Sequence, residues 1–237
     1  MRAFAAPAMG LILSVASTGC MSDTGLRSTS LQDPVVAEDF ASFPIGEVWE
    51  EGAVLGGWLN EFDGYGSVAV REVDGSPALT AVPARADDPG MTHAALIRTT
   101  AEFGDTLDLQ VRATTLAQVR TGSDPNPWET AWVAWSYTDA EHFYYVALKT
   151  NGWELGKRDP AYTGGQRFLA DGRDVTFPVG TAAEVEILQN GAEMTVIVDG
   201  VALTTFEDTE RPYLAGAVGL YTEDAAVAFD DVVIATP

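Results

Sequence analysis

Large aromatic side chains and a few cations gather between Trp128 and Arg167, and their chemistry suits the binding of a sugar. The aromatic candidates are Trp128, Trp132, Tyr144 and Trp153, and the cationic candidates are Lys149, Lys157 and Arg167. Aromatic rings can stack on the apolar faces of pyranose rings, while a few polar groups fix the hydroxyls. We therefore interpret these residues as a candidate carbohydrate-binding set, with Trp128 expected in an exposed loop. The same rings would equally suit a sandwich core, and the same cations would suit surface ion pairs.

Titratable residues in the same region raise a catalytic alternative. His142, Tyr144 and Lys149 could act as base, acid and charge stabiliser in β-elimination on a uronic acid. Strand alternation, however, puts Lys149 on the opposite face from the other two. Glu154 with Glu61 or Asp63 could supply the two carboxylates of a glycoside hydrolase, but no spacing singles such a pair out. No catalytic residue is therefore assigned.

Strand-like runs position these candidates. Residues 131–137, 142–149 and 153–158 are rich in aromatic and β-branched residues, and Asn151-Gly152 between the last two runs is typical of a hairpin turn. In the middle run, Tyr144 shares one face with alternate residues, while Tyr145 falls on the other. We expect one face to lie in the core and the other to form a surface.

The rest of the chain repeats the period-two pattern. Residues 184–189, 194–198 and 201–206 are separated by Asn-Gly and Asp-Gly pairs, which predicts a three-stranded antiparallel meander. Residues 175–177 are expected to form a further short strand. No helical period longer than two turns appears. Many short strands without helices predict an all-β, two-sheet antiparallel jelly-roll sandwich.

The acidic composition limits the range of partners. The 237 residues include 35 acidic and 13 basic side chains, for a formal net charge of -22. Nucleic acids and anionic membrane surfaces both require a basic patch, so neither is expected as a partner. Anionic polysaccharides are also disfavoured, unless basic residues cluster locally.

The beginning of the chain predicts export. Residues 1–19 combine an early arginine, an apolar run too short to span a membrane and small residues before Cys20. This end resembles a bacterial lipoprotein signal in which Cys20 is lipidated, although Ser17 stands where leucine is usual. Residues 20–34 are expected to be a flexible tether, and residues 35–237 the folded domain. We expect a cell-envelope lipoprotein or a secreted protein, touching a membrane only through the lipid.

The final segment, G-A-V-G-L-Y-T-E-D-A-A-V-A-F-D-D-V-V-I (residues 216–234), resembles the closing strands of concanavalin A-like lectin/glucanase jelly rolls. Y-Y-V-A-L-K, E-L-G-K and V-D-G earlier in the chain match the same group. The resemblance is closest to laminin-G-like modules and to the 3-keto-disaccharide hydrolase domain, which is glycoside hydrolase family 16-like. It implies a two-sheet jelly roll with a curved face that binds glycans in many relatives. The family 16 catalytic pattern Glu-x-Asp-x-x-Glu begins at Glu61 but has Gly66 at its last position, so its carboxylates cannot be carried over.

The same resemblance implies a structural calcium ion between the first and last strands of the domain. Asp230 matches the aspartate of the closing motif, and Glu38 is the nearest equivalent at the front. Calcium takes six to eight oxygen ligands, many of them carbonyls that a sequence does not reveal. Asp230 would equally suit a solvated strand edge.

These patterns predict an exported, non-catalytic protein that binds a poly- or oligosaccharide, with calcium as the possible cofactor. Two alternatives stay open. One is a glycan-cleaving enzyme of the same fold, either a glycoside hydrolase or a polysaccharide lyase. The other is a structural or adhesive surface module that binds protein.

Overall fold

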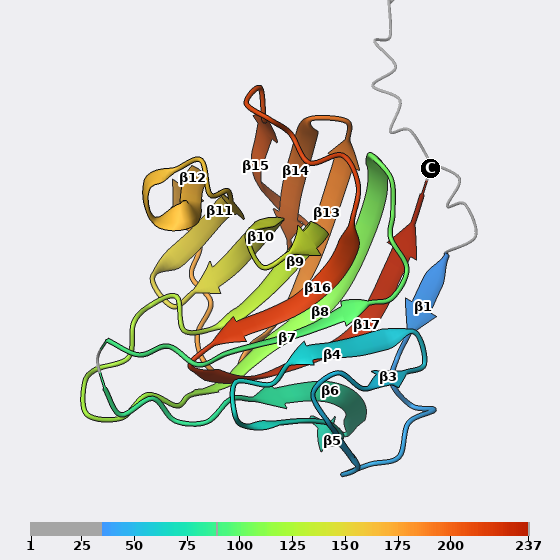
Figure 1. Ribbon diagram of the computed structural model, residues 1–237, viewed down its shortest axis with the longest axis vertical. Coiled ribbons are helices and arrows are strands. Elements are labelled where there is room, and N and C mark those ends of the chain that lie inside the picture. Colours follow the sequence, from blue (N-terminus) through green and yellow to red (C-terminus); the bar gives the residue numbers. More distant parts are fainter. Residues whose placement is uncertain (1–34, 89, 237) are drawn as a thin grey trace, which may run out of the picture. The chain divides into compact units, whose positions relative to one another are not determined.

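Two antiparallel β-sheets face each other in the computed structural model of the protein (Figure 1). The structure describes residues 35–88 and 90–236. The expected signal segment (residues 1–19), Cys20 and the expected tether (residues 20–34) lie outside the described residues. Within the described part of the chain, no helix is long and apolar enough to cross a membrane.

Sheet A is built from long central strands and shorter outer ones. It runs, in spatial order, through β15 (Val201–Glu207), β14 (Glu193–Val198), β13 (Ala182–Asn190), β8 (Thr106–Gln118), β17 (Ala225–Ala235), β6 (Ser76–Val82), β5 (Ser67–Val73) and β2 (Val48–Trp49). A short strand, β1 (Val36–Glu38), also pairs with β17.

Sheet B contains the aromatic block. Its spatial order is β12 (Gln166–Gly172), β11 (Gly152–Arg158), β10 (His142–Lys149), β9 (Ala131–Asp139), β16 (Ala217–Glu223), β7 (Ala94–Thr99), β4 (Trp58–Phe62) and β3 (Val54–Leu55). A single 3-10 turn, η1 (Thr163–Gly165), links β11 to β12. The fold is thus the predicted all-β, two-sheet antiparallel sandwich.

Turn chemistry explains why the hairpins form where the sequence predicted them. Asp74-Gly75 and Asp199-Gly200 both have positive φ at both residues. This is the type I′ geometry that matches the twist of the flanking strands. The meander of β13, β14 and β15 is confirmed by its antiparallel registers. The β10–β11 turn differs by one residue, because Lys149 pairs with Gly152 and leaves Thr150 and Asn151 as the loop.

One expectation about strands was wrong. Residues 175–177 form no strand, because this segment carries the chain from β12 in sheet B to β13 in sheet A. Phe177 instead buries its ring in the core, and its amide donates to the Lys149 carbonyl at 3.1 Å. Glu61, where the incomplete family 16 pattern begins, belongs to β4.

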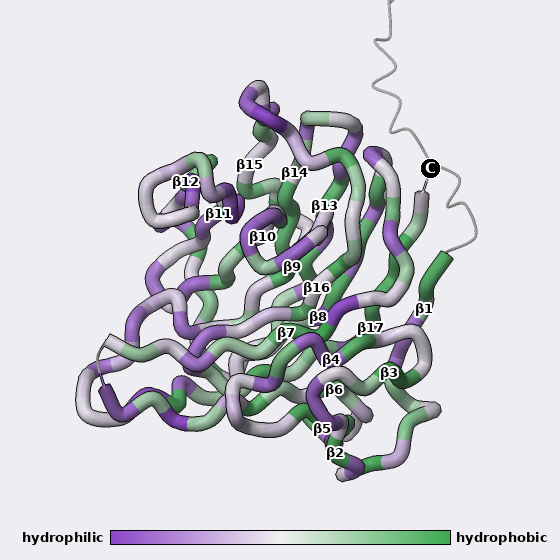
Figure 2. Tube along the Cα trace, viewed as in Figure 1, coloured by the Kyte–Doolittle hydropathy of each residue, from purple (hydrophilic) through white to green (hydrophobic). Residues whose placement is uncertain are grey.

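The core lies between the sheets, but the middle of sheet B is buried on both faces. Tyr144, Val146 and Leu148 of β10 point into the core against sheet A. Their neighbours Tyr145 and Ala147 belong to a second, mainly aromatic cluster on the outer face of sheet B. Figure 2 shows hydrophobic residues along the strands of the sandwich and hydrophilic stretches in the connecting loops. The predicted alternation in this strand is therefore confirmed, with an additional apolar layer outside it.

Candidate functional site

A groove crosses the outer face of sheet B and consists of two adjoining pockets. The larger, which we call the Lys149 pocket, has a volume of about 420 Å³, and the smaller, the Arg158 pocket, of about 180 Å³. Both pockets are lined by Trp132, Gln166 and Glu223, so we call them together the outer groove. The Lys149 pocket is also lined by Trp128, Lys149, Glu154 and Phe168, and the Arg158 pocket by Tyr137, Phe143, Arg158 and Tyr221.

The floor of the outer groove is a layer of packed rings. Trp132 of β9 stacks on Tyr145 of β10 at 4.7 Å between centroids, with 26° between the ring planes. On its other side Trp132 meets Tyr221 of β16 at 5.2 Å. The Trp132 indole also donates to the Trp128 carbonyl at 2.7 Å, which fixes the ring and ties it to the preceding loop. These contacts leave the floor little freedom to rearrange.

A polar network rises from this floor beside Lys149. The Tyr145 hydroxyl donates to Glu154 Oε1 at 2.9 Å, and Lys149 Nζ donates to Glu154 Oε2 at 3.1 Å. Gln166 donates to the same Tyr145 hydroxyl. Burial, with the charge of Glu154, raises the pKa of Tyr145 well above its ordinary value, so the phenol keeps its proton and acts as a donor. The network holds Glu154, Lys149 and Gln166 in fixed positions along one wall.

Glycine at position 156 makes room for this network. Gly156 lies directly opposite Tyr145 in the β10–β11 ladder. A Cβ atom at Gly156 would overlap the Tyr145 hydroxyl and ring. The absence of a side chain therefore lets the tyrosine lie over β11, where it reaches both Glu154 and Gln166.

Glu223 is the carboxylate shared by the two pockets. Its Oε1 accepts a hydrogen bond from Tyr221 at 2.7 Å. Burial raises the pKa of Glu223 above its ordinary value, and the charges of Asp224 and Glu129 add to the rise, while the Tyr221 hydrogen bond and the Arg158 charge oppose it. A carboxyl group of this kind can either accept or, once protonated, donate a hydrogen bond to a ligand.

Two aromatic side chains stand at the rim rather than in the floor. Trp128 is 41% exposed and Phe168 is 63% exposed, although both line the Lys149 pocket. The loop that carries Trp128 is held by buried ion pairs, since Arg120 bonds Glu129 and Asp224 at 2.5 Å each. The rim therefore offers two aromatic side chains to solvent, Trp128 on a loop whose base is fixed and Phe168 on β12.

The structure brings together three of the predicted carbohydrate-binding residues, namely Trp128, Trp132 and Lys149. It places Tyr144 and Trp153 elsewhere, because their rings pack between the sheets in the main core. Lys157 and Arg167 also lie away from the outer groove, at a cluster around Asp208. Alternation alone could not say which face of a strand the second sheet covers.

Sequence reasoning named Glu154 only as a possible catalytic carboxylate, and it missed Tyr145, Gln166, Phe168 and Glu223. A signal existed for Tyr145, since it shares the Lys149 face of β10. No such signal existed for Gln166 and Glu223, which reach the site only through the strand order of sheet B.

Lys157 is an internal structural cation. It is fully buried, and its Nζ donates to Asp208 at 2.7 Å and to the Glu210 carbonyl at 2.6 Å. Asp208 also accepts from the Tyr144 hydroxyl at 2.7 Å. Burial alone would raise the pKa of Asp208, but the hydrogen bonds from Lys157 and Tyr144 outweigh it and lower that pKa. This cluster fastens the chain after β15 to sheet B.

The candidate catalytic groups are not gathered into one site. His142 pairs with Asp139 at 2.8 Å, and Tyr144 points into the core, whereas Lys149 lies on the outer face. Glu61 is paired with Arg98 at 2.7 Å. Of these groups, only Lys149 and Glu154 line the outer groove in the described part of the chain, whereas His142, Tyr144, Glu61 and Asp63 do not.

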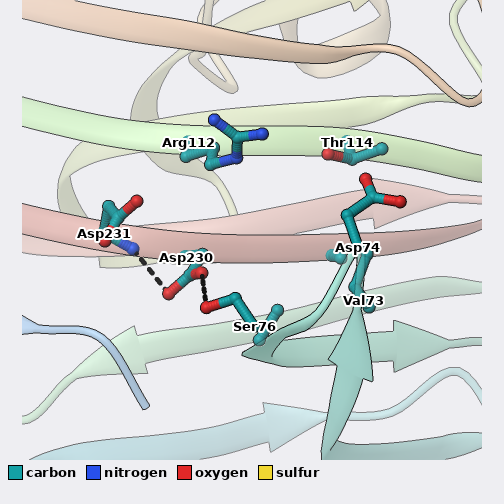
Figure 3. A pocket seen from close by; sticks show the side chains of 9 residues that line it. Val73, Asp74, Ser76, Arg112, Thr114, Asp230 and Asp231 are labelled. Atoms are coloured by element: carbon teal, nitrogen blue, oxygen red, sulfur yellow. Dashed lines mark hydrogen bonds between the residues drawn. The ribbon is translucent and has the colours of Figure 1, made fainter. Parts of the chain in front are cut away.

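The two predicted calcium ligands line different pockets. Glu38 lies beside Asp39 and accepts from the Phe40 amide at 2.8 Å. Asp230 lies on the outer face of sheet A, where it accepts from Ser76 at 3.0 Å and from the Asp231 amide at 2.8 Å (Figure 3). Among residues 35–88 and 90–236, no group of three or more His, Cys, Asp or Glu side chains could hold a metal. These side chains do not form a calcium site by themselves, so a clamp completed by carbonyl oxygens stays a prediction.

Comparison with solved structures supports the fold. The chain is similar to the carbohydrate-binding module CBM66 from Bacillus subtilis, with a TM-score of 0.55 and 15% identity over 76% of this chain and 96% of that one. It is also similar to a Bacillus subtilis protein of unknown function with a galectin-like fold, with a TM-score of 0.51 and 10% identity over 82% and 98% of the two chains. No family model matches the sequence, and no curated protein matches it. The chain thus has the concanavalin A-like sandwich fold, while the closer resemblance to laminin-G-like and family 16-like domains stays a prediction.

Replacing Lys157 by methionine should destabilise the protein by about 3–5 kcal/mol, because it removes the buried cation of the Asp208 carboxylate and leaves only the longer ionic contact from Arg167 at 3.2 Å. Arg112→Met is the matched control. Its pair with Glu184 is 41% and 57% exposed on the two side chains, and its loss should cost less than about 1 kcal/mol. Urea unfolding at neutral pH measures both differences.

The pH dependence of the free energy of unfolding gives a second test of the Lys157–Asp208 pair. Because the pKa of Asp208 is lowered by folding, its contribution is present above the unfolded-state pKa and is lost as the pH falls through the folded-state value. The stabilities of wild type and Lys157→Met should therefore converge in acid. Equal losses in Lys157→Met and Arg112→Met at neutral pH would contradict the structural role.

Proposed function

We propose that this protein binds a poly- or oligosaccharide in the outer groove without cleaving it. One observation carries the proposal: exposed Trp128 and Phe168 stand over a pocket whose wall holds Lys149, Glu154 and Gln166 in a fixed network. Ring faces for stacking beside ordered donors and acceptors are what a sugar ring requires.

The size of the groove supports a ligand of a few sugar units. The Lys149 pocket, at about 420 Å³, lies within the range of small-molecule sites, which is roughly 300–1,000 Å³. The adjoining Arg158 pocket extends the same surface. The similar fold of a protein named as a carbohydrate-binding module supports this proposal by analogy, since fold alone does not determine function.

A structural or adhesive role fits the groove less well. A protein-binding module would offer a flat apolar patch, whereas the outer groove is hollowed and combines rings with charged side chains. We therefore favour a glycan as the ligand over a protein.

The proposed setting is the cell envelope, with Cys20 as a lipid anchor. The proposal rests on the signal-like residues 1–19 and the Gly19-Cys20 pair. Expression of the full chain in bacteria with labelled palmitate should label the wild type and not Cys20→Ser. Equal labelling, or none in either, would remove the anchor from the proposal.

Trp128→Ala should weaken glycan binding about 10- to 30-fold, because it removes an exposed ring at the rim of the Lys149 pocket while its carbonyl can still accept from Trp132. Leu188→Ala is the control, since Leu188 is a similarly exposed apolar residue on sheet A. Retention on a panel of immobilised neutral and acidic glycans identifies the ligand, and calorimetry then gives the affinities. Unchanged affinity in Trp128→Ala would place the binding surface elsewhere.

Glycan cleavage is the second candidate, and one observation favours it. Glu154 and Glu223 both line the Lys149 pocket, and the raised pKa of Glu223 suits a general acid. Their strands are three spacings apart in sheet B, roughly 14 Å between backbones, and the carboxyl groups of glycosidases lie about 5–9.5 Å apart. The two side chains would therefore have to reach towards each other across Trp132.

Incubating the protein with each retained glycan should release no new reducing ends, if binding is the whole function. Glu223→Gln and Glu154→Gln are the diagnostic variants. If the wild type releases reducing ends and either variant lowers the rate of release by a factor of 100 or more, the protein is a hydrolase and the binding proposal is wrong. Release that both variants retain would point to a contaminating enzyme and leave the binding proposal standing.

A further inference from the structure

Arg158 is an unusual cation within the described residues. The basic side chains that form salt bridges there are Arg98, Arg112, Arg120, Lys149, Lys157, Arg167 and Arg211. The remaining four are Arg71, Arg85, Arg158 and Arg173, and of these only Arg158 is partly buried rather than exposed. Among residues 35–88 and 90–236, no carboxylate lies within salt-bridge distance of this partly buried guanidinium, and such a position is costly, so it calls for an explanation.

The surroundings of Arg158 form a pocket rather than a packed interior. Arg158 lines the Arg158 pocket together with Gln166 and the rings of Phe143 and Tyr221. A Cβ atom at Gly165 would lie 3.3 Å from its Nη2 atom, so the turn before β12 packs closely against the guanidinium. This neighbouring backbone limits the freedom of the side chain, which shares the pocket with the aromatic residues Phe143 and Tyr221.

The charges of the outer groove are balanced, in contrast to those of the whole chain. Lys149 and Arg158 face Glu154 and Glu223, whereas the chain as a whole has 35 acidic and 13 basic residues. Lys149 already forms a salt bridge with Glu154, with 3.1 Å between Nζ and Oε2. Arg158 is thus the cation of the groove that is available to form a bidentate ion pair with an incoming carboxylate.

We propose that the Arg158 pocket recognises the carboxylate of a uronic acid residue, so that the glycan held in the outer groove is an acidic oligosaccharide. This inference rests on the proposed function and narrows it to one class of sugar. The neighbouring sugar unit of the glycan occupies the Lys149 pocket, because the two pockets adjoin and share Trp132, Gln166 and Glu223. The ring of the uronate lies against Phe143 or Tyr221.

Glu223 sets the pH dependence of this recognition. It shares the pocket with Arg158 on β11, whose charge lowers its pKa, while the charges of Asp224 and Glu129 raise it and Tyr221 on β16 donates to it. The other charged or titratable groups around it are Lys149, Glu154, Tyr145 and Arg120. Ionised Glu223 repels an incoming carboxylate, while protonated Glu223 can donate to it. Because burial raises the pKa of Glu223, lowering the pH towards that value should tighten uronate binding while the sugar carboxylate stays ionised.

The test compares uronate oligosaccharides with their methyl esters, which keep the sugar ring and lose the charge. Galacturonate, mannuronate, guluronate and glucuronate oligomers of matched length are titrated into the protein by calorimetry. Wild type should bind at least one free acid about 10-fold or more tightly than its ester. Arg158→Ala should abolish this preference and keep the ester affinity, while Arg158→Lys should restore part of it.

Arg71→Ala is the matched control, since Arg71 is an exposed arginine without a salt bridge on sheet A, and it should keep the full preference. Thermal unfolding of each variant checks that the fold is intact. Equal affinity of wild type for acid and ester would overturn the inference and leave the proposed function standing. The inference would also be overturned if Arg158→Ala weakened the affinity for the free acid and for its methyl ester equally, because Arg158 would then bind the sugar hydroxyls rather than the carboxylate. Failure of every neutral and acidic glycan to bind would overturn both proposals.

Discussion

The middle of sheet B has to bury apolar side chains on both faces, and much of the structure follows from this constraint. Sheet A covers the inner face, where Tyr144 and Trp135 pack in the main core. The outer face has no second sheet over it, and it is covered by its own rings, above all the stacked pair of Trp132 and Tyr145. Stacked rings cover a large area with few rotatable bonds, so this layer is held in place without a further sheet over it. This rigid layer of aromatic rings forms the floor of the outer groove.

The same packing fixes the polar groups of the groove. Tyr145 is held by its stack on Trp132 and by the space that Gly156 leaves over β11. Its hydroxyl is therefore placed where it can donate to Glu154 and accept from Gln166. Buried donors and acceptors that are already paired with each other need no reorganisation when a ligand arrives. The core of the sheet and the chemistry of the groove consequently depend on one tyrosine.

The sequence predicts the fold better than the site, and particular residues show why. Period-two alternation correctly separated Tyr144 from Tyr145, because side chains on a strand must point to opposite faces. It could not tell which face sheet A would cover, so Tyr144 and Trp153 looked as suitable as Trp132. Lys157 looked like a surface cation because its partner Asp208 lies 51 residues away. Glu223 joins the groove only because β16 pairs with β9, and such long-range pairing leaves no local pattern.

The acidity of the whole chain and the proposed acidic ligand act over different distances. At physiological salt, charges are screened beyond about 8–10 Å, so most of the net charge of -22 is not felt by an ion already in the groove. There the nearby charges decide, and Arg158 acts within a partly desolvated pocket where Coulomb interactions are stronger than in water. The distant charge instead slows the approach of an anion, because it acts before contact. A short-range preference for a carboxylate is therefore compatible with a strongly acidic protein, and the affinity should reside mainly in slow dissociation.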